Sequence, residues 1–511
     1  MANVTYPGVY MEEISSGVRP LAAASTSTAA FVGLTEKGPT DGVERITNWT
    51  EYQKHYGIFI PGSYLAESVF QFFNNGGSQC YIVRVTRTDA AAAAVTVQNR
   101  EATPADAITF SAKNEGAWGN SLHLQIEDGT DDSANTFKVS IRIAEPGTDS
   151  EEIKDTDPRE VFDNLSMDTA SRDYVMTVIN NRSSLLSAVV LYDPKTQPDL
   201  TNPDLRPAKT TDVIPLANGT DGEAALNETS YSSEFTRLDT ITDFSLLAVP
   251  GIGTTIMMDA GMTYCSNRNL QDVFYIGEMS QDEDIPAEAE AFRGSIASPN
   301  SYGAVYYPWI KALDPSGKSK EPVLLPPSGY IAGLFARIDS DRGVWKAPAG
   351  TEATLSGAVG LASILTDVQQ GNLNRINVNC IRRFVASGIV TWGARTVTSD
   401  PEWTYVPVRR MAIMLRVSIY NGLQWVVFEP NDEDLWGQIR LNLNSFMMTL
   451  FRKGAFQGSS ASQAFFVKCD AETTTQDDIN LGIVNVLVGF APLKPAEFVV
   501  VKISQKAGQA S

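Results

Sequence analysis

The sequence predicts a multidomain α+β protein in which an acidic, β-rich domain is inserted into an α/β domain. The chain has 511 residues, more than one compact core can bury, so two to four domains are expected. Apolar strands alternate with helical segments before residue 89 and after residue 235, which indicates an α/β layer. Residues 89–235 are acidic, rich in turn-forming residues and alternate between apolar and polar positions. This pattern predicts an exposed β-rich or α+β insertion.

The residues before the insertion predict two strands and a helix. Ala29–Leu34 is an apolar run typical of a buried strand, and residues 81–85 form a second such run. Between them, Tyr64–Phe73 places apolar side chains on one helical face, and Gly76 and Gly77 end the helix. We expect these elements to share an α/β domain with the segments that follow the insertion.

The residues after the insertion continue the alternation and then become helical. Residues 244–249 and 273–276 are apolar runs that predict buried strands, and residues 286–297 predict a helix. Two amphipathic helices follow at about residues 408–423 and 435–451. The second helix has an apolar stripe that consists of Leu435, Trp436, Ile439, Leu443, Phe446, Met447 and Leu450.

Both ends of the chain predict β-strands with no local partner. Residues 4–14 are rich in strand-forming residues but are split by Pro7-Gly8, and residues 497–504 follow two prolines. A lone strand cannot bury itself, so each end either joins a sheet of its own domain or is captured by a sheet of another molecule. The residues expected to form these strands are Val4, Tyr6, Val9 and Tyr10 at the N-terminus and Phe498, Val499, Val500, Val501 and Ile503 at the C-terminus.

The formal net charge of −20 is unevenly distributed along the chain. From residue 371 onward there are 14 lysines and arginines against 11 aspartates and glutamates, whereas residues 101–170 contain 16 acidic and 5 basic residues. So large a negative charge argues against a general nucleic-acid-binding protein, which would carry a basic stripe. A slightly basic C-terminal part on a strongly acidic remainder predicts two surfaces with different partners.

The sequence lacks the residue patterns that catalysis or metal binding requires. Its four cysteines form no CxxC pair, and its histidines, His55 and His123, have no suitably spaced partner. It contains no GxSxG motif. Gly317-Lys318-Ser319 ends like a phosphate-binding loop, but the required earlier glycine is Ala312, and Pro315 intrudes. We therefore expect no enzyme activity, cofactor or metal ion.

No basic-then-apolar leader precedes a cleavage site, and no apolar run reaches about 18 residues, so neither secretion nor membrane insertion is expected.

Short blocks outside the insertion are too specific to be generic. They are Tyr6 to Tyr10, Phe31 to Pro39, Pro326 to Arg337, Arg342 to Gly350, Leu373-Asn374, Val408 to Arg410, Phe428 to Asn431, Gly454 to Phe456, Cys469 to Thr474 and Pro495 to Val499. In this order the blocks resemble the contractile tail sheath proteins of myovirus-type phages, tailocins and contractile injection systems. The resemblance covers about residues 1–85 and 240–511, and Gly116–Asn120 in the insertion looks like a feature of the longer phage-type sheaths.

The resemblance implies a structural subunit with no catalytic role. Sheath subunits stack as hexameric rings around an inner tube, exchange strands through their terminal arms, and contract to drive the tube through a bacterial envelope. The implied partners are other copies of the chain, the tail tube protein, and the baseplate and terminator or neck proteins, without nucleic acid or membrane insertion. The implied place is a virion tail assembled in the bacterial cytoplasm, with a tailocin or an extracellular injection system as the alternative.

The resemblance also implies a division of the chain and a candidate contact surface. The expected parts are an N-terminal arm and linker (1–28), a middle α/β domain (29–88 and 236–365), an outer insertion (89–235), an inner C-terminal domain facing the tube (366–490) and a C-terminal arm (491–511). Arg440, Arg452 and Lys453 are candidate tube contacts, and a solvated polar helix face is the alternative interpretation.

Two other classes of protein remain as alternatives. An enzyme of the phage or bacterial envelope would need a catalytic triad or metal cluster, and a static shell or adhesin protein would form assemblies of one fixed length.

Overall fold

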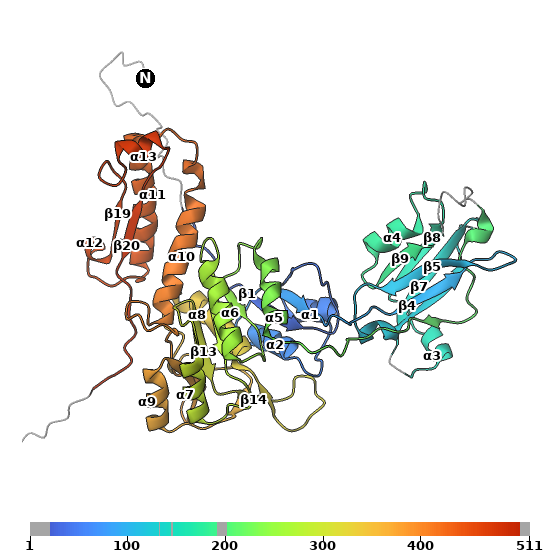
Figure 1. Cartoon of the computed structure of the whole chain (residues 1–511), viewed down its shortest axis with the longest axis horizontal. Helices are drawn as coiled ribbons and strands as arrows, with labels where there is room; N and C mark the ends of the chain where they lie inside the picture. Colours follow the sequence, from blue (N-terminus) through green and yellow to red (C-terminus); the bar gives the residue numbers. More distant parts are fainter. Residues whose placement is uncertain (1–20, 132, 145–146, 192–201, 501–511) are drawn as a thin grey trace, which may run out of the picture. The chain divides into compact units, whose positions relative to one another are not determined.

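The structure is a computed structural model that describes residues 21–131, 133–144, 147–191 and 202–500 (Figure 1). Its contacts divide the chain into two compact units. The first unit comprises residues 1–30, 70–80 and 239–511, and the second comprises residues 31–69 and 81–238. Helices and sheets are both abundant, which confirms the mixed α/β character predicted from the sequence.

The first unit contains a run of five neighbouring strands in the order β11-β12-β13-β17-β18. The strands are β11 (Leu246–Ala248), β12 (Phe274–Glu278), β13 (Gly303–Tyr307), β17 (Val378–Phe384) and β18 (Gly388–Thr391). The first four are parallel, and β18 returns antiparallel to β17. β11, β12 and β13 are buried throughout, as the continuous apolar runs predict for strands covered on both faces.

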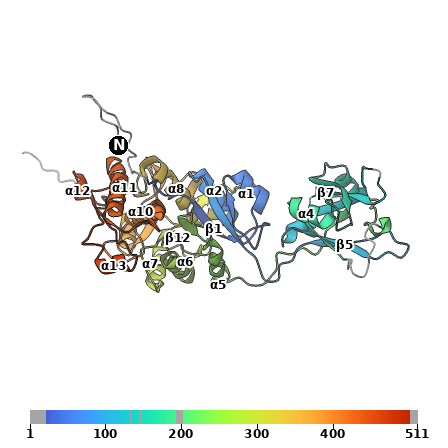
Figure 2. The same cartoon turned by 90° about the horizontal axis from the view of Figure 1, so that it is seen from above.

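Helices cover both faces of this run of strands. They are α6 (Thr255–Asn267), α7 (Pro286–Ser295), α8 (Pro327–Arg342) and α9 (Asp367–Arg375). Because successive strand residues point to opposite faces, Gly277 of β12 lies against Met258 of α6, whereas the Phe274 ring lies 6.4 Å from that of Phe335 on α8. Figure 2 shows α8 on one face and α6 and α7 on the other.

A small antiparallel sheet follows the parallel strands in the order β15-β14-β16. Its strands are β14 (Ile310–Ala312), β15 (Val323–Leu325) and β16 (Ala358–Leu361). The loop between β14 and β15 contains Gly317-Lys318-Ser319, and the Asp314 carboxylate accepts hydrogen bonds from the backbone N–H groups of Ser316 (2.9 Å) and Ser319 (2.7 Å). These bonds confirm the interpretation of the segment as a closed loop.

The C-terminal part of the first unit packs two long helices against a two-stranded sheet. Its elements are α10 (Val406–Gly422), α11 (Glu433–Arg452), α12 (Ala461–Ala464), β19 (Phe465–Lys468), α13 (Gln476–Asn480) and β20 (Leu487–Phe490). The seven residues of the predicted α11 stripe are each at most 6% exposed, which confirms the helical periodicity.

The turn after α8 packs a tryptophan against a glycine. Gly343 ends the helix with φ of +95°, a conformation that side chains disfavour. The Trp345 ring lies 2.4 Å from where a Cβ of Gly343 would sit, so only glycine lets the ring approach this closely.

Besides its inserted part, the second unit contains three strands and three helices, of which one helix is shared with the first unit. The strands β1 (Ala29–Leu34), β3 (Cys80–Val85) and β2 (Glu44–Ile46) are neighbours in that order. The helices are α1 (Trp49–Tyr56), α2 (Leu65–Asn74) and, after the insertion, α5 (Glu228–Ser232). The predicted strands at residues 29–34 and 81–85 and the predicted helix at 64–73 are confirmed.

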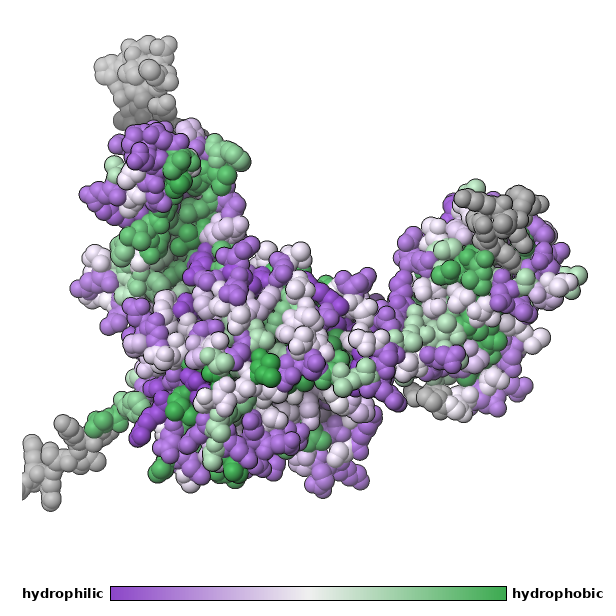
Figure 3. Space-filling model, in the orientation of Figure 1, coloured by the Kyte–Doolittle hydropathy of each residue, from purple (hydrophilic) through white to green (hydrophobic). Residues whose placement is uncertain are grey.

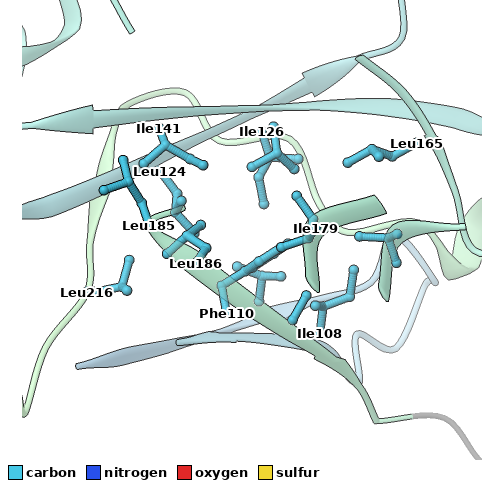
Figure 4. Packing of buried hydrophobic residues seen from close by; sticks show 14 of the residues in the cluster. Ile108, Phe110, Leu124, Ile126, Ile141, Leu165, Ile179, Leu185, Leu186 and Leu216 are labelled. Carbon is cyan, nitrogen blue, oxygen red and sulfur yellow. The ribbon is translucent and has the colours of Figure 1, made fainter. Parts of the chain in front are cut away.

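The inserted part of the second unit forms two antiparallel sheets around one apolar core. One sheet has the order β4-β5-β9 and the other β10-β6-β7-β8. The elements are β4 (Ala94–Gln98), β5 (Asp106–Ala112), β6 (Leu122–Asp128), β7 (Thr136–Ile143), α3 (Ser150–Lys154), β8 (Glu160–Ser166), α4 (Val175–Arg182), β9 (Leu186–Val190) and β10 (Ile214–Pro215). Figure 4 shows side chains such as Phe110 of β5, Ile126 of β6 and Ile179 of α4 converging between the sheets.

Candidate functional site

The segment that leads out of the N-terminal arm is bonded to the first unit. The predicted arm residues Val4, Tyr6, Val9 and Tyr10 lie outside the described residues. The described chain begins at residue 21, and the backbone N–H of Ala24 donates to Ser418 Oγ of α10 at 2.9 Å.

A buried ion pair lies under this segment and joins α8 to α10. Arg410 on α10 donates to both carboxylate oxygens of Asp339 on α8, at 2.9 Å and 2.5 Å, and the side chains are 3% and 5% exposed. Thr26 takes part with both of its polar groups: its hydroxyl donates to Asp339 at 2.6 Å, and its carbonyl accepts from Arg410 at 2.8 Å. The Arg410 guanidinium also lies 4.5 Å from the Phe335 ring centre. The chain is therefore fixed at Thr26.

A second ion pair fixes the start of the C-terminal arm. The Arg395 guanidinium donates to both carboxylate oxygens of Glu497, with Nε and Oε1 2.9 Å apart, and both side chains are 17% exposed. Immediately beyond this pair the chain is exposed to solvent. The predicted arm residues Phe498, Val499 and Val500 are 77–82% exposed and belong to no strand of the chain. Val501 and Ile503 lie outside the described residues.

The β19–β20 sheet is a candidate acceptor for further strands. In the part of the chain that the structure describes, these strands pair only with each other, from Phe465 opposite Phe490 to Lys468 opposite Leu487. One face packs Phe465 into the α11 core, whereas Phe466 and Leu487 are each 53% exposed. Figure 3 shows a broad hydrophobic surface over the part of the first unit that carries these elements. A two-stranded sheet is marginal alone, and open edges with apolar side chains favour the addition of strands.

Phe466 also explains a glycine in the sheet. It pairs directly with Gly489, and its ring atoms lie 2.2 Å from where a Cβ of Gly489 would sit. The ring thus covers the bare backbone of β20, which pins the register of the two strands.

The first unit contains a basic cavity beside the C-terminal segment. Its volume is about 840 Å³. The cations that line it are Arg342, Lys346, Lys453 and Lys494, and aromatic walls come from Trp345 and Trp392. Residues 493–498, which the Arg395–Glu497 pair holds in place, form one side. We refer to this feature below as the basic cavity.

The three candidate tube contacts are not gathered at one point. Arg440 donates a hydrogen bond to the backbone carbonyl of Cys469, whereas Arg452 and Lys453 are exposed at the C-terminal end of α11. At 1.5 Å per helical residue, Arg440 and Arg452 are about 18 Å apart along the helix axis. Lys453 instead lines the basic cavity.

Glu278 is a buried carboxylate at the C-terminal end of β12, where enzymes with parallel sheets often bind ligands. Its side chain is 3% exposed and accepts hydrogen bonds from the backbone N–H of Gly251 (2.5 Å) and from that of Ser328 at the start of α8 (3.0 Å). Burial raises the pKa of the Glu278 carboxyl to about 7, against the opposing effect of these N–H donors. The group binds its own backbone, so its role is to join β12 to α8.

The stability of the first unit should therefore depend on pH through Glu278. Since its pKa lies above the value of about 4.3 in an unfolded chain, Glu278 favours folding below that value, and the contribution is lost as pH rises through about 7. We expect the free energy of unfolding to fall by about 2 kcal/mol between about pH 5.5 and about pH 8 because of this group. In urea titrations at several pH values, the free energy of unfolding of Glu278→Gln should lack this part of the slope against pH. The exposed control Glu352→Gln should keep it. Identical slopes in the two variants would contradict the assignment.

The described ranges contain neither a cluster of metal ligands nor a membrane-spanning helix. No group of three His, Cys, Asp or Glu side chains there is placed to hold a metal ion. None of the helices in those ranges combines the length and hydrophobicity that crossing a bilayer demands. The four cysteines are buried and unbridged.

Sequence reasoning missed the residues that fix the two arms. Asp339, Arg395 and the pairing of Glu497 were not predicted, although Arg410 and Glu497 lie inside blocks quoted for the family resemblance. The available signal was the presence of a charged residue within each block. A single sequence does not show which distant residue pairs with that charge.

Two family models match the chain. The phage tail sheath protein central domain matches residues 236–397, and the phage tail sheath C-terminal domain matches residues 398–506.

Two curated proteins are similar over part of the chain. A prophage major tail sheath protein of Pseudomonas aeruginosa is 27% identical over 174 residues, which is 34% of this chain and 44% of that protein. The tail sheath protein of Burkholderia phage BcepMu is 29% identical over 164 residues, 30% of this chain and 34% of that protein. The chain thus spans less than half the length of the curated relatives that it matches.

Solved structures share the fold over nearly the whole chain. The contracted helical sheath of the anti-feeding prophage has a TM-score of 0.60 at 23% identity, covering 98% of this chain and 100% of that one. The contracted sheath complex of the extracellular injection system PVC also has a TM-score of 0.60, at 22% identity and 99% coverage of both chains. A sheath tail protein of Listeria innocua reaches 0.62 at 10% identity, covering 93% of this chain and 96% of that one.

Proposed function

Because the chain belongs to the contractile tail sheath family, we propose that it polymerises as stacked hexameric rings around an inner tube and contracts to drive the tube through a bacterial envelope. The family consists of structural proteins, not enzymes. One observation carries the proposal: both arms leave the body at fixed points, while no other described strand pairs with either edge of the β19–β20 sheet. The six-fold symmetrised baseplate of the anti-feeding prophage, to which the fold is similar, supports a hexameric ring.

The arms would hold the polymer together by strand exchange. Each arm adds a strand to the β19–β20 sheet of a neighbouring copy, so that Val4, Tyr6, Val9 and Tyr10 pair along one edge. The C-terminal arm residues Phe498, Val499, Val500, Val501 and Ile503 pair along the other. A main-chain hydrogen bond contributes only about 1 kcal/mol net, but two arms per copy, repeated along a polymer, give a strong mesh.

The arrangement of domains would follow from this exchange. The inner domain, built from both chain ends, faces the tube, the middle α/β domain surrounds it, and the acidic insertion lies outermost. The tube protein is contacted by Arg440, Arg452 and Lys453. The exposure of Arg452 and Lys453 supports this assignment. Arg440 makes its contact while it keeps its hydrogen bond to the Cys469 carbonyl. Baseplate and terminator or neck proteins bind the ends of the polymer.

Contraction would draw on energy stored in a metastable extended assembly and needs no nucleotide. The particle is a phage tail assembled in the host cytoplasm, and the insertion, with its phage-type Gly116–Asn120 block, favours this over a tailocin or an extracellular injection system.

Electron microscopy of the purified protein tests the proposal. We expect negatively stained samples to contain striated tubes in two states, one longer and narrower than the other, because the same arms connect the copies before and after contraction. Assemblies of one fixed length would favour a static shell. Monodisperse monomers that persist under assembly conditions would contradict the proposal.

A further inference from the structure

A strained, fully exposed phenylalanine projects from the loop before α11. Phe428 is 102% exposed, and its neighbour Val427 is 60% exposed. Phe428 has φ of +70°, a left-handed conformation that is rare and energetically unfavourable for bulky residues. Neither strain nor exposure of this ring stabilises the free chain, so both point to a contact made with another molecule.

The loop that presents Phe428 is fixed by hydrogen bonds. The backbone N–H of Glu429 donates to the Val426 carbonyl at 3.1 Å. The Asn431 side chain donates to the Ile483 carbonyl at 3.0 Å and accepts from the Trp436 indole at 2.9 Å. The ring is therefore held outward by a defined loop, as a preorganised binding group is.

The surroundings of Phe428 are acidic. Glu429, Asp432, Glu433 and Asp434 are all exposed, and no lysine or arginine occurs between Arg416 and Arg440. We refer to residues 427–434 as the acidic loop. A partner must therefore offer an aromatic-sized socket with positive charge around it.

The chain itself carries such a socket. The basic cavity has aromatic walls from Trp345 and Trp392, and its volume of about 840 Å³ accommodates a phenylalanine together with part of its loop. Among its cations, Lys494 is exposed, and Arg342 is half exposed in an ion pair with Glu352 at 2.7 Å. A surface pair of this kind exchanges partners at little cost.

We propose that the acidic loop of one copy docks into the basic cavity of a second copy, with Phe428 as the buried anchor. Aromatic character and charge are complementary between the two surfaces, and the cavity volume is large enough for the ring. The contact joins different patches of the two copies, so it propagates along a ring or helix and does not close a symmetric pair. The inference deepens the proposed function, since it identifies one body-to-body contact within the polymer in addition to the exchanged arms.

Cysteine crosslinking tests this contact directly, because the native cysteines are buried. Full-length Val427→Cys and Asn374→Cys proteins, which keep the Phe428 anchor, are mixed, assembled and oxidised; Asn374 lines the cavity from α9. We expect a covalent dimer in this mixture, at a yield at least about tenfold above a mixture with Val368→Cys, since a disulfide needs Cα atoms within about 7 Å. Val368 lies on the same helix, is 75% exposed and does not line the cavity. Equal yields from the two mixtures would overturn the proposal.

Charge reversal gives a second, independent measurement. Arg342→Glu and Glu429→Arg should each raise the protein concentration needed for assembly by about tenfold, and the double variant should recover most of that loss, as coupled interface charges do. Circular dichroism should show native folding throughout. Additive losses in the double variant would count against the contact.

The outcome also separates this proposal from the proposed function. Wild-type tubes without the Asn374-specific crosslink would refute only the docking contact. If the wild-type chain forms no tubes, the proposed function fails. The docking contact can still be decided in that case, because the same cysteine mixture can be crosslinked at high protein concentration and its dimer yield compared with that of the Val368→Cys mixture.

Discussion

Deletion of residues 1–16 abolishes polymerisation and leaves a folded monomer. The chain is bonded to its body from Ala24 and Thr26 onward, so the deletion removes none of the described packing. It does remove Val4, Tyr6, Val9 and Tyr10, which we propose to pair with a neighbouring sheet. Negative-stain microscopy should find no tubes, and circular dichroism and size-exclusion chromatography should find a native monomer.

A truncation at the other end provides the control for this deletion. Removal of residues 505–511 leaves both predicted strands in the sequence and should allow tubes to form. Contraction-competent tubes built by the protein that lacks residues 1–16 would show that the N-terminal arm has no role in strand exchange.

Replacement of Arg410 by alanine lowers the free energy of unfolding of the first unit by about 3–5 kcal/mol, because it leaves the Asp339 carboxylate buried and without its counter-ion. The Thr26 carbonyl also loses its bond to Arg410. Urea-induced unfolding of the monomeric deletion variant measures the effect without interference from assembly.

A matched control separates burial from charge. Arg342→Ala removes an arginine–carboxylate pair whose side chains are 50% and 55% exposed, and it should cost no more than about 1 kcal/mol. Replacing both buried partners, as in Asp339→Leu with Arg410→Met, should recover part of the loss. A cost below about 1 kcal/mol for Arg410→Ala would show that the buried pair does not hold α8 against α10.

Local patterns in the sequence predicted the elements whose side chains follow one period. The stripe of α11 is an example, since burial of every third or fourth residue leaves a direct trace in the sequence. The helix α10 is different, because an amphipathic pattern alone would place arginines on its polar face, whereas Arg409 and Arg410 are 7% and 3% exposed. Arg409 lies 3.7 Å from the Trp403 ring centre, and Arg410 is neutralised by Asp339. From the sequence alone, a charged residue is predicted to be exposed unless its distant partner is known.

The features of the candidate site also divide into those that the sequence could predict and those that it could not. The strand-forming composition of the arms is local and is visible in the sequence, and the pairing of the arms in strands stays a prediction. The partners that fix the arms could not, since Arg410 is 71 residues from Asp339 and Arg395 is 102 residues from Glu497. The strain at Phe428 was also invisible, because a positive φ at a bulky residue runs against its own preference and is imposed by the surrounding loop.

The two ion pairs at the ends of the body determine where a pull on the protein would be carried. Tension on the N-terminal arm enters at Thr26 and is divided between two helices through Asp339 and Arg410, while tension on the C-terminal arm enters at Glu497 and reaches Arg395. Dissolved salt hardly screens the Asp339–Arg410 pair, whose side chains are 5% and 3% exposed. A pull on either arm would thus reach the packed helices and strands of the first unit through these side chains in addition to the main chain.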